Sequence, residues 1–132
     1  MAEHEAIYPD ERHALYERHG YSPAIRSGDL LFVSGQVGSR QDGTPEPDFE
    51  EQVDRAFRNL TAVLEAAGCT LADIIDVTTF HTDPEAQMDI LLPVKNRHFE
   101  GFPVPNWTAV GVTWLAGFDF EIKVVARVPQ RT

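Results

Sequence analysis

The segment from Tyr21 to Gln36 reads YSPAIRSGDLLFVSGQ and carries the strongest early fold signal of the chain. Residues 24–26 lead into the turn-forming residues 27–29, Ser-Gly-Asp, and the dense apolar run 30–34 follows. Apolar runs on both sides of a glycine-containing turn predict a β-hairpin. The polar segment 39–47 contains one glycine and two prolines and predicts a loop.

The clearest helix is predicted after this loop. Asp48 is a favourable N-cap, Glu51 follows three residues later as in a capping box, and Gly68 supplies a C-terminal stop. Apolar residues between these limits recur at spacings of three and four, which places them on one helix face. The residues predicted to face the core are Phe49, Val53, Phe57, Leu60, Leu64 and Ala67.

The second half of the chain predicts a strand, a helix and two further strands. The run 74–82 is rich in β-branched residues and predicts a strand. Residues 85–100 predict a second helix, which Pro93 must kink or interrupt. Two long strands are predicted at 107–115 and 119–128, separated by a tight turn.

This order of elements predicts an α+β fold with both helices on one side of the sheet, because they cannot cover both faces. Residues 1–20 are expected to form an arm or a short helix packed on the domain. The open sheet face keeps apolar residues that self-association is predicted to cover. The alternating residues expected there are Val110, Val112 and Trp114, or Phe120, Ile122 and Val124.

Composition and charge exclude several functional classes. The 132 residues, 42% hydrophobic and 24% charged, are typical of one soluble globular domain. Eleven basic residues against 21 acidic ones give a net charge of −10, which disfavours nucleic acid as a partner. No run approaches the roughly 18 apolar residues of a membrane span, and the first residues do not resemble a secretory signal. We therefore expect a cytoplasmic protein without a membrane partner.

Standard motifs for metal binding and catalysis are absent from the sequence. The five histidines lack zinc-binding spacing, and the single Cys69, expected to be buried, forms no CxxC pair. Ser34 lacks the context of a nucleophile elbow, and the glycines fit no phosphate-binding loop. His81 is predicted to have a structural role, either at the solvent edge or hydrogen-bonded. We expect neither a metal nor an organic cofactor.

Several blocks of the sequence nevertheless resemble one family. The hairpin segment is similar to the opening signature of the RidA family, which is also called YjgF or RutC-like. The segment PNWTAVGV at 105–112 is most similar to the YjgH branch of that family. The resemblance covers residues 21–128, and its blocks lie, in order, at 21–36, 56–68, 74–83, 103–112 and 120–126.

This resemblance implies a chorismate-mutase-like fold, with a mixed six-stranded sheet and two helices on one face. It also implies a homotrimer with small-molecule clefts between neighbouring subunits. Members of the main branch hydrolyse 2-enamines and 2-imines to 2-keto acids and ammonia, without a metal or organic cofactor. The chain then divides into an arm at 1–20, one domain at 21–128 and a C-terminal tail at 129–132.

Site residues also follow from the resemblance. Tyr21 matches the cleft tyrosine, and Gly35 matches the glycine whose backbone lies beside the substrate. Glu121 matches, across a one-residue gap, the glutamate that positions the attacking water. Trp107 stands where the family has its substrate-binding arginine, and a second cleft residue of the family, an asparagine, falls near Leu92. The candidate site is therefore catalytic Glu121 with substrate-binding Tyr21, Gly35 and Trp107.

The exchange of arginine for Trp107 directs the functional prediction. A guanidinium offers a carboxylate paired donors and a permanent charge, whereas an indole offers one neutral N–H and a wide apolar face. Losing a sheltered charge pair of this kind costs roughly 2–5 kcal/mol of binding free energy. We therefore expect a diverged hydrolase or ligand-binding protein whose cleft prefers aromatic or apolar ligands to small anions.

Two alternatives stay open. The chain is an ordinary 2-enamine/2-imine deaminase if Arg26 or another cation replaces the missing arginine. A non-catalytic protein-interaction or holdase role is favoured by the acidic charge but has no motif. Tyr21 and Trp107 also fit plain packing roles, and Lys123 can neutralise Glu121 on the same strand face. The sequence names neither a substrate nor a pathway.

Overall fold

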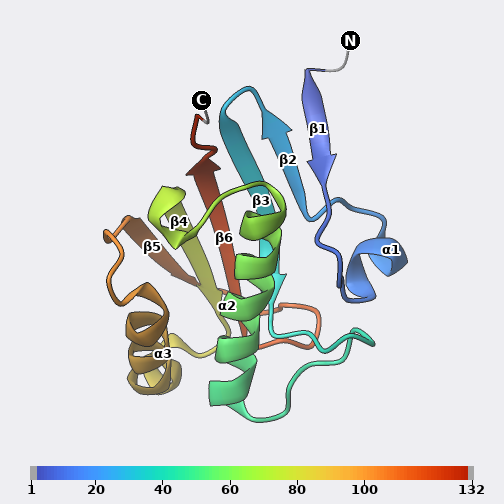
Figure 1. Ribbon diagram of the computed structural model, residues 1–132. Coiled ribbons are helices and arrows are strands. Elements are labelled where there is room, and N and C mark those ends of the chain that lie inside the picture. The colour runs from blue at the N-terminus through green and yellow to red at the C-terminus, as the bar shows by residue number, and fades with distance from the viewer. Residues whose placement is uncertain (1–2, 131–132) are drawn as a thin grey trace.

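The chain folds around one sheet whose strands follow the spatial order β1-β2-β3-β6-β4-β5 (Figure 1). The computed structural model describes residues 3–130, and within them the predicted mixed six-stranded sheet and α+β class are confirmed. Neighbouring strands are antiparallel except β4 and β5, which are parallel. The strands are β1 His4–Ile7, β2 Ala24–Ser27, β3 Leu30–Val37, β4 Ile74–His81, β5 Asn106–Gly111 and β6 Phe120–Arg127. The helices are α1 Leu15–His19, α2 Phe49–Ala66 and α3 Pro84–Phe99, with a 3-10 turn, η1, at Leu71–Asp73.

The N-terminal segment forms one strand, β1, and one short helix, α1, in addition to the five strands and two helices expected in the rest of the chain. β1 pairs antiparallel with β2 at the edge of the sheet, and α1 follows it beside the same edge (Figure 1). Gly20 ends α1 at a φ of 72°, in the left-handed region that favours glycine. Residues 1–2 of the predicted arm and 131–132 of the predicted tail lie outside the described residues.

The predicted hairpin is formed by β2 and β3. Ser27 pairs with Leu30 across the turn, and Leu31 and Val33 point into the core, where they are fully buried. The register of β3 against β6 shifts between Val33 and Gln36. Such a bulge re-aims the residues it contains, here Ser34 and Gly35.

α2 forms as its sequence predicts. The Asp48 carboxylate caps the helix by accepting a hydrogen bond of 3.1 Å from the Glu51 backbone N–H. α2 and α3 cover the same face of the sheet (Figure 1), and the core lies between this face and the two helices. Cys69, just after α2, is buried in this core as predicted.

Of the two effects expected from Pro93, an interruption of the helix does not occur, because α3 continues through this residue. A proline removes the hydrogen bond to the carbonyl four residues earlier, which here belongs to Asp89. Both Pro93 and Asp89 are exposed, so that carbonyl lies on the side of the helix that faces water. Water can therefore satisfy the Asp89 carbonyl, and the helix can continue through Pro93.

The last two strands also differ from the prediction. β5 ends at Gly111, and β6 is not its neighbour, because β6 lies between β3 and β4. Residues 112–119 form a connection in which Ala116 and Gly117 have positive φ angles of 56° and 97°. β6 is therefore central, and its residues that face the helices are the fully buried Phe120, Ile122 and Val124. These three were wrongly expected on the open face.

Of the other expected set, Val110 does lie on the open face of the sheet, whereas Val112 and Trp114 follow the end of β5. Phe32 of β3 is 44% exposed and Val110 of β5 is 39% exposed. Half-buried Val125 lies opposite Phe32, and half-buried Phe80 lies opposite Val110. Glu121 and Lys123 of β6 share this face with them, since residues two apart on a strand point the same way. None of the helices within residues 3–130 has both the length and the apolar character to cross a membrane.

Candidate functional site

Three of the four predicted site residues meet in one cavity. Tyr21, Gly35 and Glu121 line a space of about 250 Å³ between α1, the end of β3 and the connection after β5. Its walls are completed by Leu15, Arg18, His19, Val37, Gly43, Pro45, Leu115, Ala116 and Phe118. The sequence alone did not predict that the connection 112–119 would form part of these walls.

Glu121 reaches this cavity by passing directly over Gly35. Glu121 pairs with Val37 across the β3–β6 ladder, beyond the bulge that contains Gly35. A Cβ atom added to Gly35 would lie 2.3 Å from Glu121 Oε2 and 2.5 Å from its Cδ, far inside normal contact distance. The absence of a side chain at Gly35 thus leaves room for the carboxylate in this position, and the backbone angles of Gly35 do not themselves favour glycine.

The cavity shifts the acid–base properties of both polar side chains. Burial raises the pKa of Glu121, and nearby Lys123 offsets part of that rise. Burial also raises the pKa of Tyr21, with a further contribution from the negative charge of Glu121. A carboxyl group with a raised pKa is better suited to exchange protons near neutral pH, and Tyr21 keeps its phenolic proton there.

Tyr21 is held in place by α1. Its backbone N–H donates to the Tyr16 carbonyl at 3.0 Å, and the two rings meet edge to face at 5.3 Å. The Tyr16 hydroxyl in turn donates to Gln36 Oε1 at 2.8 Å. Tyr21 is thus tied through α1 to β3, the strand that carries Gly35.

Trp107 lies apart from these three residues. It sits on β5 opposite Val77, on the sheet face that packs against the helices, whereas Glu121 points from the other face. It lines a separate pocket of about 150 Å³ between β4, β5 and α3. The two pockets are therefore separate, and we call the Glu121 cavity the first half-site and the Trp107 pocket the second half-site. The second is lined by Thr79, Met88, Leu91, Leu92, Lys95, Trp107 and Ala109.

The indole of Trp107 is fixed by its neighbours. Nε1 donates to Thr79 Oγ1 at 3.1 Å, and Phe99 contacts the ring edge to face at 5.8 Å. Thr79 Oγ1 also lies 2.7 Å from His81 Nε2, so the predicted hydrogen-bonded role of fully buried His81 is confirmed. With its N–H engaged, the indole offers the pocket only its apolar face.

Lys95 is the residue of this second pocket that sequence reasoning missed. Its Nζ lies 4.9 Å from the centroid of the Trp107 ring. Met88, Leu91, Leu92 and Lys95 follow the spacing of one helix face, so this periodicity could have placed Lys95 beside Leu92, the position near which the family's asparagine falls.

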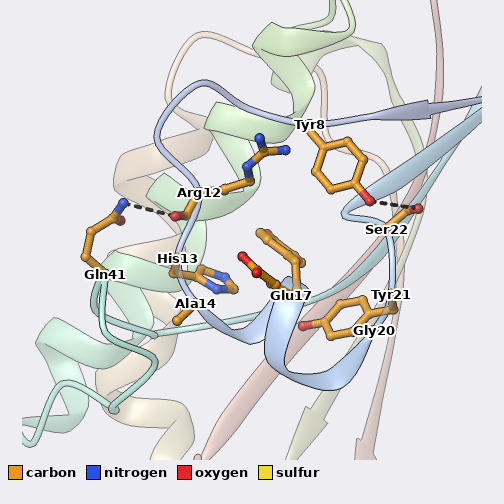
Figure 2. A pocket seen from close by; sticks show the side chains of 10 residues that line it. Tyr8, Arg12, His13, Ala14, Glu17, Gly20, Tyr21, Ser22 and Gln41 are labelled. Atoms are coloured by element: carbon orange, nitrogen blue, oxygen red, sulfur yellow. Dashed lines mark hydrogen bonds between the residues drawn. The ribbon is translucent and has the colours of Figure 1, made fainter.

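A wider cavity of about 670 Å³ lies beside the arm (Figure 2). Tyr8 and Arg12 reach it from the segment after β1, and Tyr21 reaches it from the segment after α1 (Figure 2). The Arg12 guanidinium lies 4.6 Å from the Tyr8 ring centroid. His13 stacks on Tyr16 at 4.2 Å, and burial lowers the pKa of His13 to about 4. Tyr21 thus lines both this cavity and the one that contains Glu121.

The described part of the chain contains no candidate metal site. Among residues 3–130, no group of three or more His, Cys, Asp or Glu side chains is arranged to hold a metal ion.

Comparison with known proteins settles the family. The family model described as Endoribonuclease L-PSP matches residues 11–128. The RutC family protein YjgH of Escherichia coli (strain K12) is 69% identical over 131 residues, which cover 99% of this chain and 100% of that relative. The chain belongs to the RutC family.

Other similar proteins support the assignment of this chain to the RutC family. A solved structure of protein YJGH has a TM-score of 0.94 and 68% identity, and the match covers 98% of this chain and 100% of that one. A 2-iminobutanoate/2-iminopropanoate deaminase of Dermatophagoides farinae is 30% identical over 100 residues, covering 72% of this chain and 74% of the relative. The predicted family and its YjgH branch are confirmed.

Proposed function

We propose that this RutC-family chain forms a homotrimer that binds small molecules with an apolar or aromatic body in clefts between its subunits, and that it hydrolyses a C=N bond there. The observation that carries the proposal is the Glu121 carboxyl group. It is half-buried, has a raised pKa and lies against Gly35 in a cavity shared with Tyr21. The name of the Dermatophagoides relative supports the same chemistry.

Two features of the protomer support self-association, and the family resemblance supports three as the number of subunits. The Glu121 cavity and the Trp107 pocket belong to different faces of the sheet, so a neighbouring subunit is needed to complete a cleft that contains both. Phe32 and Val110 leave an apolar patch on the open face that a second copy would cover. Sedimentation equilibrium should give three times the subunit mass of 14.8 kDa. A monomer at micromolar concentration would refute the shared cleft.

The proposed hydrolysis uses the side chains of the first half-site. The Glu121 carboxylate accepts a proton from water as the water oxygen bonds to the C=N carbon, and the C=N electron pair moves to nitrogen. Nitrogen takes up the proton that Glu121 received from water, which gives the carbinolamine. Nitrogen then gains the hydroxyl proton of the carbinolamine as the C–N bond breaks, so that a carbonyl group forms and ammonia leaves. The Tyr21 hydroxyl is protonated at neutral pH and can donate a hydrogen bond to the substrate, while the Gly35 backbone leaves room beside Glu121.

The reaction can be tested with imines made in place. An L-amino-acid oxidase converts phenylalanine, leucine or alanine to the 2-imino acid, and ammonia release is compared with that in buffer alone. Glu121→Gln should lower the enzymatic part of the rate about 100-fold, within the range for losing a general base. Exposed Glu85 on α3 supplies the matched control, and Glu85→Gln should leave the rate unchanged. Release no faster than in buffer refutes the hydrolysis.

Substrate preference separates this proposal from ordinary small-imine deamination. The flat face of Trp107 should favour imines from phenylalanine and leucine over the imine from alanine. The reverse preference would support the ordinary deaminase instead. RNA cleavage, which the family description names, is not proposed for this chain, because a net charge of −10 disfavours phosphate backbones.

A further inference from the structure

The second half-site contains a cation whose position suggests a ligand. Lys95 Nζ lies over the face of Trp107 at 4.9 Å from the ring centroid, which holds the ammonium group at the wall of the 150 Å³ pocket. The lysine is half-buried and lines this pocket.

Lys95 differs from the other basic residues near the end of α3. Arg97 and His98 both contact the Asp54 carboxylate of α2, at 3.4 and 2.7 Å. Lys95 makes no ion pair within residues 3–130 and faces β5 instead. Its charge is therefore available to an anion that enters the pocket.

The remaining walls of the pocket indicate which uncharged group the anion should carry. They are almost entirely apolar, and the Thr79 hydroxyl is already bonded to Trp107 Nε1 and His81 Nε2. An apolar cavity of about 150 Å³ admits a ring the size of benzene. The pocket thus combines one cation with space for an aromatic or branched aliphatic group.

We propose that Lys95 and Trp107 together bind a monocarboxylate with an aromatic or branched aliphatic body, the carboxylate on the Lys95 ammonium and the body against the apolar pocket walls that Trp107 completes. This inference rests on the proposed function, because it names the substrate class of the same cleft. It assigns the anion contact to α3, whereas the strand position held by Trp107 supplies an apolar surface.

Binding of two matched probes to the full-length protein tests the assignment. Isothermal titration is run with 3-phenylpropionate and with its neutral analogue 3-phenylpropionamide. The wild type should bind the carboxylate about tenfold more tightly than the amide, as expected for one partly exposed charge-assisted contact. Lys95→Met keeps the aliphatic stem and should reduce carboxylate affinity to that of the amide, while leaving amide binding unchanged.

Two further variants locate the effect. Arg58→Met removes an exposed positive charge from α2 and should preserve the discrimination between the probes. Trp107→Leu should weaken both probes by a similar factor, because it removes the shared apolar surface.

The outcomes separate the two proposals. Equal affinity of the wild type for the two probes, or discrimination that survives Lys95→Met, overturns the Lys95 assignment and leaves the cleft intact. Binding of neither probe at millimolar concentration overturns both the assignment and the proposed function.

Discussion

Replacing Gly35 by alanine should displace the Glu121 carboxylate. The new Cβ would lie 2.3 Å from Oε2, 2.5 Å from Cδ and 2.9 Å from Cγ of Glu121, so the side chain must rotate away. Overpacking of this kind typically costs about 1–3 kcal/mol of unfolding free energy. We expect the lower part of that range, about 1–2 kcal/mol, because a carboxylate that moves toward water also recovers hydration.

A double-mutant cycle measures this contact. Urea unfolding is followed at fixed protein concentration for the wild type, Gly35→Ala, Glu121→Ala and the double variant. Removing the Glu121 side chain should relieve most of the cost of Gly35→Ala, which gives a coupling free energy of about 1 kcal/mol. NMR titration of Gly35→Ala should also show the pKa of Glu121 lower than in the wild type, since burial is what raises it.

Gly111→Ala is the matched control. Gly111 also belongs to a strand, but its added Cβ would lie 3.4 Å from the nearest atom, Pro84 Cγ, which is ordinary contact. This variant should show no coupling to Glu121→Ala. Independent effects of Gly35→Ala and Glu121→Ala, together with an unchanged Glu121 pKa, would refute the close approach and with it the geometry of the proposed water-orienting carboxylate.

Three further outcomes are expected. Burial lowers the pKa of His13 from 6.5 to about 4, so between these values the unfolded chain binds more protons and stability falls as pH falls. From pH 7.5 to pH 4.5 the wild type should therefore lose about 2–3 kcal/mol more unfolding free energy than His13→Gln, and equal losses in urea titrations would contradict this. Thr79→Val removes the acceptor of the Trp107 N–H and the hydrogen-bond partner of His81, so the unfolding free energy should drop by about 1–3 kcal/mol. The near-ultraviolet circular dichroism of the tryptophans should also change. An unaltered spectrum would argue against a fixed indole. Asp48→Ala removes the N-cap of α2 and should cost about 1 kcal/mol, whereas Asp48→Asn should cost little, a difference that thermal unfolding can resolve.

Residues close in sequence determined most of the secondary structure. The Ser-Gly-Asp turn between two apolar runs predicted β2 and β3, and the spacing from Phe49 to Ala67 predicted α2 together with its Asp48 cap. These signals are reliable because turns, caps and helix periodicity depend on neighbours within a few residues. The same information placed Cys69 in the core.

Tertiary structure decided how the strands are ordered. Sequence pattern gives no strand partner, so the central position of β6 between β3 and β4 could not be derived from its own residues. That position buries Phe120, Ile122 and Val124 under the helices and turns Glu121 to the open face, beside the bulge at Gly35. The resemblance to a family named Tyr21, Gly35, Glu121 and Trp107, but only the packed sheet shows that the first three share a cavity and that Trp107 faces α3.

For Lys95, too, the sequence predicts one property and only the structure shows another. Its helix position follows from local periodicity, yet its contact with Trp107 joins α3 to β5 and depends on how the helix packs on the sheet. Local propensities specify which elements form, because they act over one or two turns of chain. Side chains from different elements come together only when the whole core is buried. Both half-sites of this protein are formed in this way, because each is lined by residues from several elements.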